Sequence, residues 1–280
     1  MLIHDSLNGS AARKSKAEHS FRTNQEMSGS KDAVESSDSW IAMDRVSAQS
    51  PVSFAVVSVC ERLLAFLLLV LTSPILFVAV LLIRLTSHGP AIYLQARVGR
   101  GGRAFILYKL RTMRHRCEVQ SGPRWSVPGD PRITPVGRFL RRTHLDELPQ
   151  LWNICRGDMR LVGPRPERPE FVVVLKRQLP LYNLRLHVTP GLTGLAQVQL
   201  PPDTDLGSVR RKLACDVYYV RCANWWLDMR ILAATALKIV GLPPSLRRVL
   251  FRLPGGPTVE NAFEDLEQNI PLAPALNSVG

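Results

Sequence analysis

The longest apolar run of the chain covers residues 63–83, which read LLAFLLLVLTSPILFVAVLLI without a charged side chain. Its length matches the roughly 20 helical residues that cross the hydrocarbon core of a bilayer. A buried core helix is the alternative, and the length of the run argues against it. The run therefore predicts a helix in contact with a membrane.

Ser73-Pro74 lies in the middle of this run. Proline removes a backbone donor and clashes with the preceding helical turn, so we expect a kink or a break there. Counted from Pro51, a straight helix would be about 50 Å long, against a hydrocarbon core of about 30 Å. This pattern alone favours a kinked span, while a bend that returns the chain to the same leaflet stays open.

Beyond Arg84 the pattern changes to short strands and amphipathic helices. Residues 91–95 and 104–108 flank VGRGGR, which predicts a β-hairpin around a glycine-rich turn. Helical patterns follow over residues 134–142, 146–155, 167–178 and 206–240, the last broken near Asn224. The predicted fold class is α+β: a mainly helical, membrane-associated domain with a small β-hairpin and one kinked hydrophobic helix.

Polar segments enclose this region at both ends. Residues 1–50 are rich in Ser, Asn, Lys and Glu, which is typical of a disordered tail. The stretch from Gly255 onward reads as a loose acidic tail. We therefore divide the chain into a tail (1–50), an apolar helix (51–86), a folded domain (87–242) and a C-terminal tail (243–280).

The net charge of +13 changes the picture because it is concentrated in one segment. Residues 84–190 hold 20 Lys and Arg against seven Asp and Glu, whereas residues 1–50 hold six against seven. A cationic segment of this kind suits phosphates, whether in nucleic acid, lipid headgroups or a phosphorylated substrate. The five cysteines form no close CxxC pair, which argues against a disulfide framework and a zinc site.

Two adjacent acids, Asp146-Glu147, stand inside this basic segment in RRTHLDELPQ. On its own the pair reads most simply as a helix N-cap, because carboxylates are stabilised at a helix N-terminus. Among phosphate-binding cations, however, a carboxylate can serve as a nucleophile toward phosphorus, and its neighbour can hold a divalent metal or manage protons.

Three further motifs supply cations. Arg165 lies between prolines in GPRP, whose fixed backbone would present the guanidinium in a set direction. Lys109 and Arg111 are two apart on the second strand, which predicts that they share a face. Arg185 precedes the glycine-rich turn of RLHVTPGLTG. The first two motifs also have ordinary structural explanations, namely a rigid linker with a solvated arginine and a polar strand face, and the Arg185 motif alone does not point to a function.

These blocks, in this order behind the apolar run, resemble the bacterial sugar transferase family, and within it the small monotopic polyprenyl-phosphate phosphoglycosyl transferases. The most specific stretches are DELPQLWN and VGPRP, and the resemblance covers roughly residues 55–240. It implies a re-entrant helix broken at Ser73-Pro74, in place of the span that the pattern favours. It also implies a bacterial inner membrane location with the catalytic domain, residues 87–242, on the cytoplasmic face.

The resemblance further implies a reaction in which a UDP-sugar and Mg²⁺ bind, and Asp146 attacks the phosphate next to the sugar and releases UMP. Polyprenyl phosphate then takes the sugar phosphate from the aspartyl intermediate. Asp146 and Glu147 are the predicted catalytic and metal-binding residues. The predicted substrate-binding residues are Lys109, Arg111, Arg141, Pro164, Arg165, Pro166 and Arg185.

The chain departs from the usual pattern at three places: Ala96, Arg160 and Gln199-Leu200. The expected partners are the UDP-sugar, the polyprenyl phosphate and membrane lipid, with no nucleic acid. A homo-oligomer and the identity of the sugar stay open. The competing hypotheses are a membrane-tethered protein that binds anionic lipid or nucleic acid, and an inactive homologue that scaffolds other enzymes.

Overall fold

A computed structural model describes residues 51–118, 122, 129–203 and 205–269. The predicted N-terminal tail, residues 1–50, lies outside the described residues. Within the described part, the chain is mostly helical with two small sheets of two strands each. The predicted α+β composition with one long apolar helix is confirmed.

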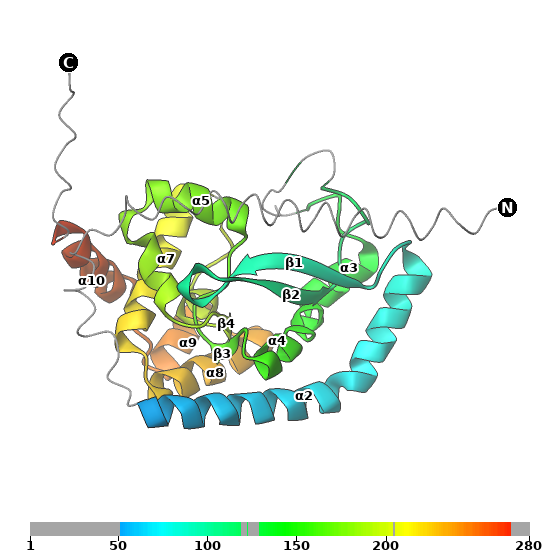
Figure 1. Cartoon of the computed structure of the whole chain (residues 1–280), viewed down its shortest axis with the longest axis horizontal. Helices are drawn as coiled ribbons and strands as arrows, with labels where there is room; N and C mark the ends of the chain where they lie inside the picture. Colours follow the sequence, from blue (N-terminus) through cyan, green and yellow to red (C-terminus); the bar gives the residue numbers. More distant parts are fainter. Residues whose placement is uncertain (1–50, 119–121, 123–128, 204, 270–280) are drawn as a thin grey trace, which may run out of the picture. The chain divides into compact units, whose positions relative to one another are not determined.

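The apolar run lies in helix α2, Pro51–Thr86, which runs along α4 (Gln150–Arg156) and β3 (Arg160–Val162) and then changes direction (Figure 1). The helix continues through Pro74, so the predicted break is wrong, while the bend fits a proline kink. Pro74 cannot donate to the carbonyl of Val70, four residues earlier. The Ser73 hydroxyl donates to that carbonyl instead, at 2.7 Å. This bond replaces the backbone hydrogen bond that proline cannot make.

The predicted β-hairpin is confirmed. Strands β1, Ile92–Val98, and β2, Ala104–Leu110, pair antiparallel with Tyr93 opposite Lys109. The connecting turn η4, Arg100–Gly102, needs left-handed backbone at Gly101 (φ 66°) and Gly102 (φ 79°), which explains the glycines. The hairpin places Lys109 beside the segment that follows helix α3, Pro135–Arg142.

Helix α3, Pro135–Arg142, begins where predicted, with the Thr134 side chain accepting a hydrogen bond from the Gly137 amide at 2.9 Å. The next helix does not begin at Asp146. A separate turn, η5, covers Leu145–Glu147, and α4 begins at Gln150 and ends at Arg156 before the left-handed Gly157. Asp146 therefore does not cap a helix, and the simplest interpretation of that residue is wrong.

A second, unpredicted sheet joins two glycine-rich segments. Strands β3, Arg160–Val162, and β4, Gly191–Thr193, pair in parallel. A Cβ atom on Gly191 would lie 2.1 Å from the nitrogen of Gly163, and one on Gly194 would lie 2.2 Å from the oxygen of Gly163. Only glycine permits this backbone approach, which brings the VGPRP segment against PGLTG.

Further helices follow the hairpin, and one of them, α8, packs against both β3 and β4 (Figure 1). They are α5 (Pro169–Gln178), η6 (Pro180–His187), α6 (Leu195–Gln199), α7 (Leu206–Cys222) and α8 (Trp225–Ile239). The break between α7 and α8 occurs at Asn224 as predicted, because the Asn224 side chain caps α8. Tyr219 is buried in the core, whereas Trp225 and Trp226 are 61% and 58% exposed.

The predicted loose tail from residue 243 is wrong for the described part of it. Residues there form α9, Pro244–Leu250, and α10, Gly256–Gln268. Val259 and Phe263 of α10 are buried in the main core against α7, and Arg210 of α7 pairs with Glu267 at 2.6 Å. The folded unit therefore extends past residue 242.

Candidate active site

The Asp146-Glu147 pair lies at the meeting point of the hairpin, η5 and the PRP segment. Lys109 Nζ lies 3.2 Å from Glu147 Oε1, and Arg165 Nη1 lies 3.3 Å from Glu147 Oε2. Arg165 Nη2 donates a second hydrogen bond to Glu147 Oε1. Burial would raise the pKa of Glu147, but the charges and hydrogen bonds of Arg165 and Lys109 hold it well below its usual value. Glu147 is therefore ionised throughout the physiological range.

Asp146 is 8% exposed, and no hydrogen bond joins its carboxylate to a described residue. Burial and the adjacent charge of Glu147 raise the pKa of Asp146 to about 6. The cations Lys109, Arg141 and Arg165 oppose this shift without cancelling it. Asp146 is thus mostly ionised at neutral pH, and its oxygens remain available to a ligand.

Arg141 reaches the pair from α3. Its Nε donates to the Thr112 hydroxyl at 2.8 Å, just beyond the end of β2. Gly137, on the same helix, allows close contact there, since a Cβ would lie 2.0 Å from the carbonyl oxygen of Thr112. The chain thus fixes α3 against the end of β2, so that Arg141 and Lys109 both act on Asp146.

The PRP segment is held rigidly behind Arg165. Each carbonyl of residues 164–167 accepts one hydrogen bond from a different donor. In chain order these donors are Gly191 N (2.9 Å), Arg185 Nη2 (2.7 Å), Arg97 Nη1 (2.9 Å) and Val98 N (2.9 Å). Pro164 and Pro166 limit the backbone further, because their φ angles are fixed by their rings. The predicted rigid presentation of Arg165 is therefore realised, with its guanidinium on Glu147.

Two predicted substrate-binding residues lie away from this cluster. Arg111 is 5% exposed and donates to the carbonyl oxygens of His88 at 2.7 Å and Ser87 at 2.8 Å, beyond the C-terminus of α2. Arg185 is 6% exposed and pairs with Asp216. Lys109, Arg141 and Arg165 come together around the acids. Arg111 and Arg185 instead bind backbone carbonyls and, for Arg185, the buried Asp216.

The sequence reading missed two cations near the site. Arg97 of β1 holds the carbonyl of Pro166, and its position two residues before Gly99 gave no distinctive signal. Lys238 of α8 donates to the Gln197 carbonyl at 2.9 Å. Burial and the nearby charge of Arg165 lower the pKa of Lys238. Neither residue could be assigned without knowing which segments pack together.

The fold and the site define a domain that carries one long, largely exposed apolar helix and a carboxylate pair, Asp146 buried and Glu147 partly buried, surrounded by cations. This arrangement is suited to phosphate chemistry. The chain belongs to the bacterial sugar transferase family, whose model matches residues 52–241. This match begins in α2 and ends just after α8. The helices α9 and α10 lie beyond it.

Curated relatives agree with this membership. The chain is 41% identical over 180 residues to a UDP-N-acetylgalactosamine-undecaprenyl-phosphate N-acetylgalactosaminephosphotransferase of Aeromonas hydrophila, with 64% of this chain and 42% of the relative covered. It is 42% identical over 181 residues to a UDP-glucose:undecaprenyl-phosphate glucose-1-phosphate transferase of Caulobacter vibrioides, with 63% and 67% covered. It is 43% identical over 176 residues to the exopolysaccharide production protein PSS of Rhizobium leguminosarum, with 61% and 87% covered. The chain thus spans less than half of the first of these relatives and most of the third.

Proposed function

We propose that this protein transfers a sugar 1-phosphate from a UDP-sugar to polyprenyl phosphate at a membrane surface and releases UMP. The observation that carries the proposal is the pairing of Glu147 with Lys109 and Arg165 beside an ionisable Asp146, whose carboxylate has no hydrogen bond to a described residue. The first two relatives named above act on UDP-sugars and undecaprenyl phosphate, in the words of their names. Both substrates are anionic, which agrees with the cations around the site.

In the first half-reaction, an oxygen of Asp146 attacks the phosphorus next to the sugar. A bond forms between this oxygen and phosphorus, and the bond from phosphorus to the bridging oxygen breaks. UMP leaves with the bonding electrons, and the sugar phosphate stays on Asp146 as a mixed anhydride. The pKa of about 6 leaves Asp146 ionised at neutral pH yet less stabilised than its neighbour Glu147.

In the second half-reaction, an oxygen of polyprenyl phosphate attacks the same phosphorus. The bond to Asp146 breaks, the carboxylate is restored, and the product is a polyprenyl diphosphate sugar. No net proton transfer is needed, so positioning and charge stabilisation dominate, as in other phosphoryl transfers. Arg141 and Lys109 are placed to offset the negative charge that gathers near Asp146.

The site also fits a divalent cation, and we propose Mg²⁺. The oxygens of Asp146 are unbonded among the described residues, and a carboxylate such as Glu147 can accept more partners than the two cations it already binds. No group of three or more His, Cys, Asp or Glu side chains in the described part forms a complete metal cage. Mg²⁺ commonly binds through one or two carboxylates together with substrate phosphates, and bound there it would neutralise phosphate charge.

Helix α2 supplies the proposed membrane contact. The segment Val56–Thr86 is long and apolar enough to cross a bilayer, and most of it is not buried by the rest of the protein. Leu71 and Phe77 are each 71% exposed, which is unfavourable in water and favourable in lipid. The exposed Trp225 and Trp226 suit the membrane interface. We propose an inner-membrane location with the catalytic residues on the cytoplasmic side and a re-entrant α2.

The direct test uses the full-length protein purified in detergent or nanodiscs, with Mg²⁺, undecaprenyl phosphate and a panel of UDP-sugars, and measures UMP. We expect UMP with at least one sugar, loss of turnover in Asp146→Asn, and loss of turnover with EDTA. No UMP from folded protein with any sugar would leave the scaffold or lipid-binding hypotheses. Full turnover in Asp146→Asn would refute the aspartyl intermediate while keeping the overall reaction.

A further inference from the structure

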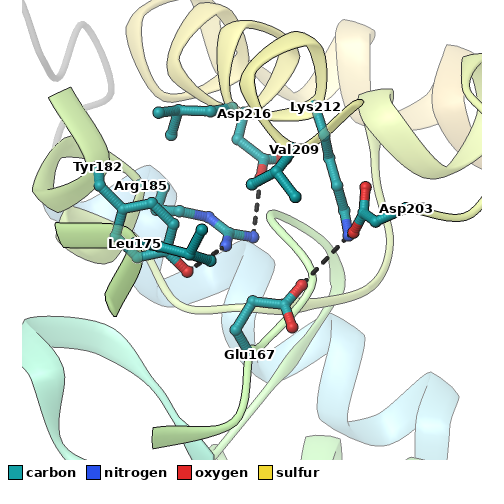
Figure 2. Close-up of a pocket in the computed structure, with 9 residues that line it drawn as sticks. Glu167, Leu175, Tyr182, Arg185, Asp203, Val209, Lys212 and Asp216 are labelled. Atoms are coloured by element: carbon teal, nitrogen blue, oxygen red, sulfur yellow. Dashed lines mark hydrogen bonds and ion pairs between the residues drawn. The ribbon is translucent and has the colours of Figure 1, made fainter. Parts of the chain in front are cut away.

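Arg185 lies behind the PRP segment in a buried network rather than in an open site. Its Nη2 lies 2.8 Å from Asp216 Oδ2, and its Nη1 donates to the Tyr182 hydroxyl at 2.9 Å. Figure 2 shows the guanidinium between these two side chains. The Nη2 group also donates to the carbonyl of Arg165 at 2.7 Å, so the network ends on the backbone of an active-site residue.

The space around Arg185 is too small for a substrate. One cavity lies between Arg185, Asp216 and Glu167, and its volume is about 10 Å³. A second lies between Arg185 and the PRP segment and is also about 10 Å³. Such a volume holds about one water molecule, whereas small-molecule sites measure roughly 300–1,000 Å³. A nucleotide or sugar therefore cannot reach Arg185 without rearrangement.

Helix α7 fixes the same segment at a second point. Lys212, one helical turn before Asp216, lies 3.2 Å from Glu167 Oε1 and 2.7 Å from Asp203 Oδ2 (Figure 2). Residues four apart on a helix face the same side. One face of α7 thus holds Glu167 directly and Arg165 through Arg185.

We propose that the Arg185–Asp216 pair is a positioning unit that holds the backbone of Arg165 so that its guanidinium stays on Glu147. This inference rests on the proposed function, since Arg165 would stabilise phosphate charge beside Asp146. Arg185 touches no substrate and acts only through Arg165. A misplacement of about 1 Å in a catalytic group lowers turnover by about 10²-fold, so loss of the pair should be visible in kinetics.

The test compares the effect of Asp216→Asn on kcat/KM in the wild type with its effect in an Arg165→Ala background. We expect Asp216→Asn to lower kcat/KM for UMP release by about 10- to 100-fold, as expected for a small displacement of Arg165. In an Arg165→Ala background the same substitution should change kcat/KM less than twofold, because the group it positions is gone. If the losses in kcat/KM from the two substitutions multiply in the double variant, Asp216 does not act through Arg165. An unchanged kcat/KM in Asp216→Asn would also overturn the proposal.

The matched control is Glu267→Gln, which removes another ion pair of α7, with Arg210, but leaves the PRP segment untouched. It should keep wild-type kcat/KM. Should Asp216→Asn fail to fold, Tyr182→Phe removes a milder contact of Arg185 and should give a smaller loss that again disappears without Arg165. No loss in folded Tyr182→Phe would then overturn the proposal.

A second measurement separates this inference from the proposed function. Deuterium uptake of the Gly191 amide, which donates to Pro164, should rise in Asp216→Asn and stay unchanged in Glu267→Gln. That result would show that the Arg185–Asp216 pair holds the PRP segment in place, even if the wild-type protein released no UMP. Unchanged uptake in Asp216→Asn would overturn the positioning role whatever the activity.

Discussion

The contact between β3 and β4 leads to a prediction that links packing to catalysis. Substituting Gly191→Ala would place a Cβ atom 2.1 Å from the nitrogen of Gly163, 2.6 Å from its Cα atom and 2.5 Å from the carbonyl oxygen of Thr193. All three are backbone atoms, so no flexible side chain can move aside. Because van der Waals contact occurs at about 3.5 Å, the two segments must separate by roughly 1 Å or more.

This separation should affect both stability and turnover. Overpacking of this kind costs about 1–3 kcal/mol. A loss of about 2 kcal/mol corresponds to a fall in Tm of about 4–8 °C for a unit of this size. Gly163 precedes the PRP segment directly, and the Gly191 amide itself holds the carbonyl of Pro164 at 2.9 Å. We therefore expect kcat to fall by about 10²-fold through displacement of Arg165.

The assay compares Tm and UMP release for the wild type, Gly191→Ala and the control Gly256→Ala. Gly256 has open space around its Cβ position and its φ lies outside the left-handed range, so the control should match the wild type. A Gly191→Ala protein with wild-type Tm and turnover would refute the reasoning. A lower Tm with unchanged kcat at a temperature well below it would show that the β3–β4 contact supports the fold without setting the position of Arg165.

Two further predictions concern groups outside the site. Arg160 pairs with Glu61 of α2 at 2.9 Å and with Asp228 of α8 at 3.2 Å. Arg160→Ala therefore leaves the buried Asp228 and the partly buried Glu61 without this cation and should cost about 3–5 kcal/mol of stability. Thermal unfolding checks this, and an unchanged Tm would contradict it. Burial raises the pKa of Cys215 to about 12, so at pH 8 iodoacetamide should modify the exposed Cys222 and leave Cys215 intact in the native protein. Modification of Cys215 before unfolding, detected by mass spectrometry, would contradict its burial.

The end of β2 explains why Lys109 lies beside the acid pair whereas Arg111 lies away from it. Alternation along a strand predicts a shared face for residues two apart, but β2 ends at Leu110. Arg111 has left the strand and turns to the carbonyls of Ser87 and His88, whose negative ends suit a cation. The two-residue alternation of β2 can be predicted from the sequence. The residue at which the strand ends cannot, because it depends on packing against α2.

The C-terminal helices show the opposite case, in which a local signal was present and was missed. Val259, Phe263 and Leu266 follow the spacing of one helical face, and they pack against the main core. The acidic composition after Arg252 outweighed this pattern in the sequence reading. By contrast, the three-residue strands β3 and β4 are too short for any periodicity, and only the glycines at 163, 191 and 194 hinted at close backbone contact.

The two acids of the pair are adjacent in sequence but have opposite electrostatic environments, and this difference supports their proposed division of labour. Glu147 takes the direct hydrogen bonds of Lys109 and Arg165, which hold its pKa low and leave it permanently charged. Burial and the repulsion of Glu147 raise the pKa of Asp146, and the cations oppose this shift only through longer-range attraction. Environments that separate the pKa values of two neighbouring acids commonly mark distinct chemical roles. In the proposed mechanism, Glu147 organises the cations while Asp146, charged and without a hydrogen bond to a described residue, keeps the reactivity that a nucleophile requires.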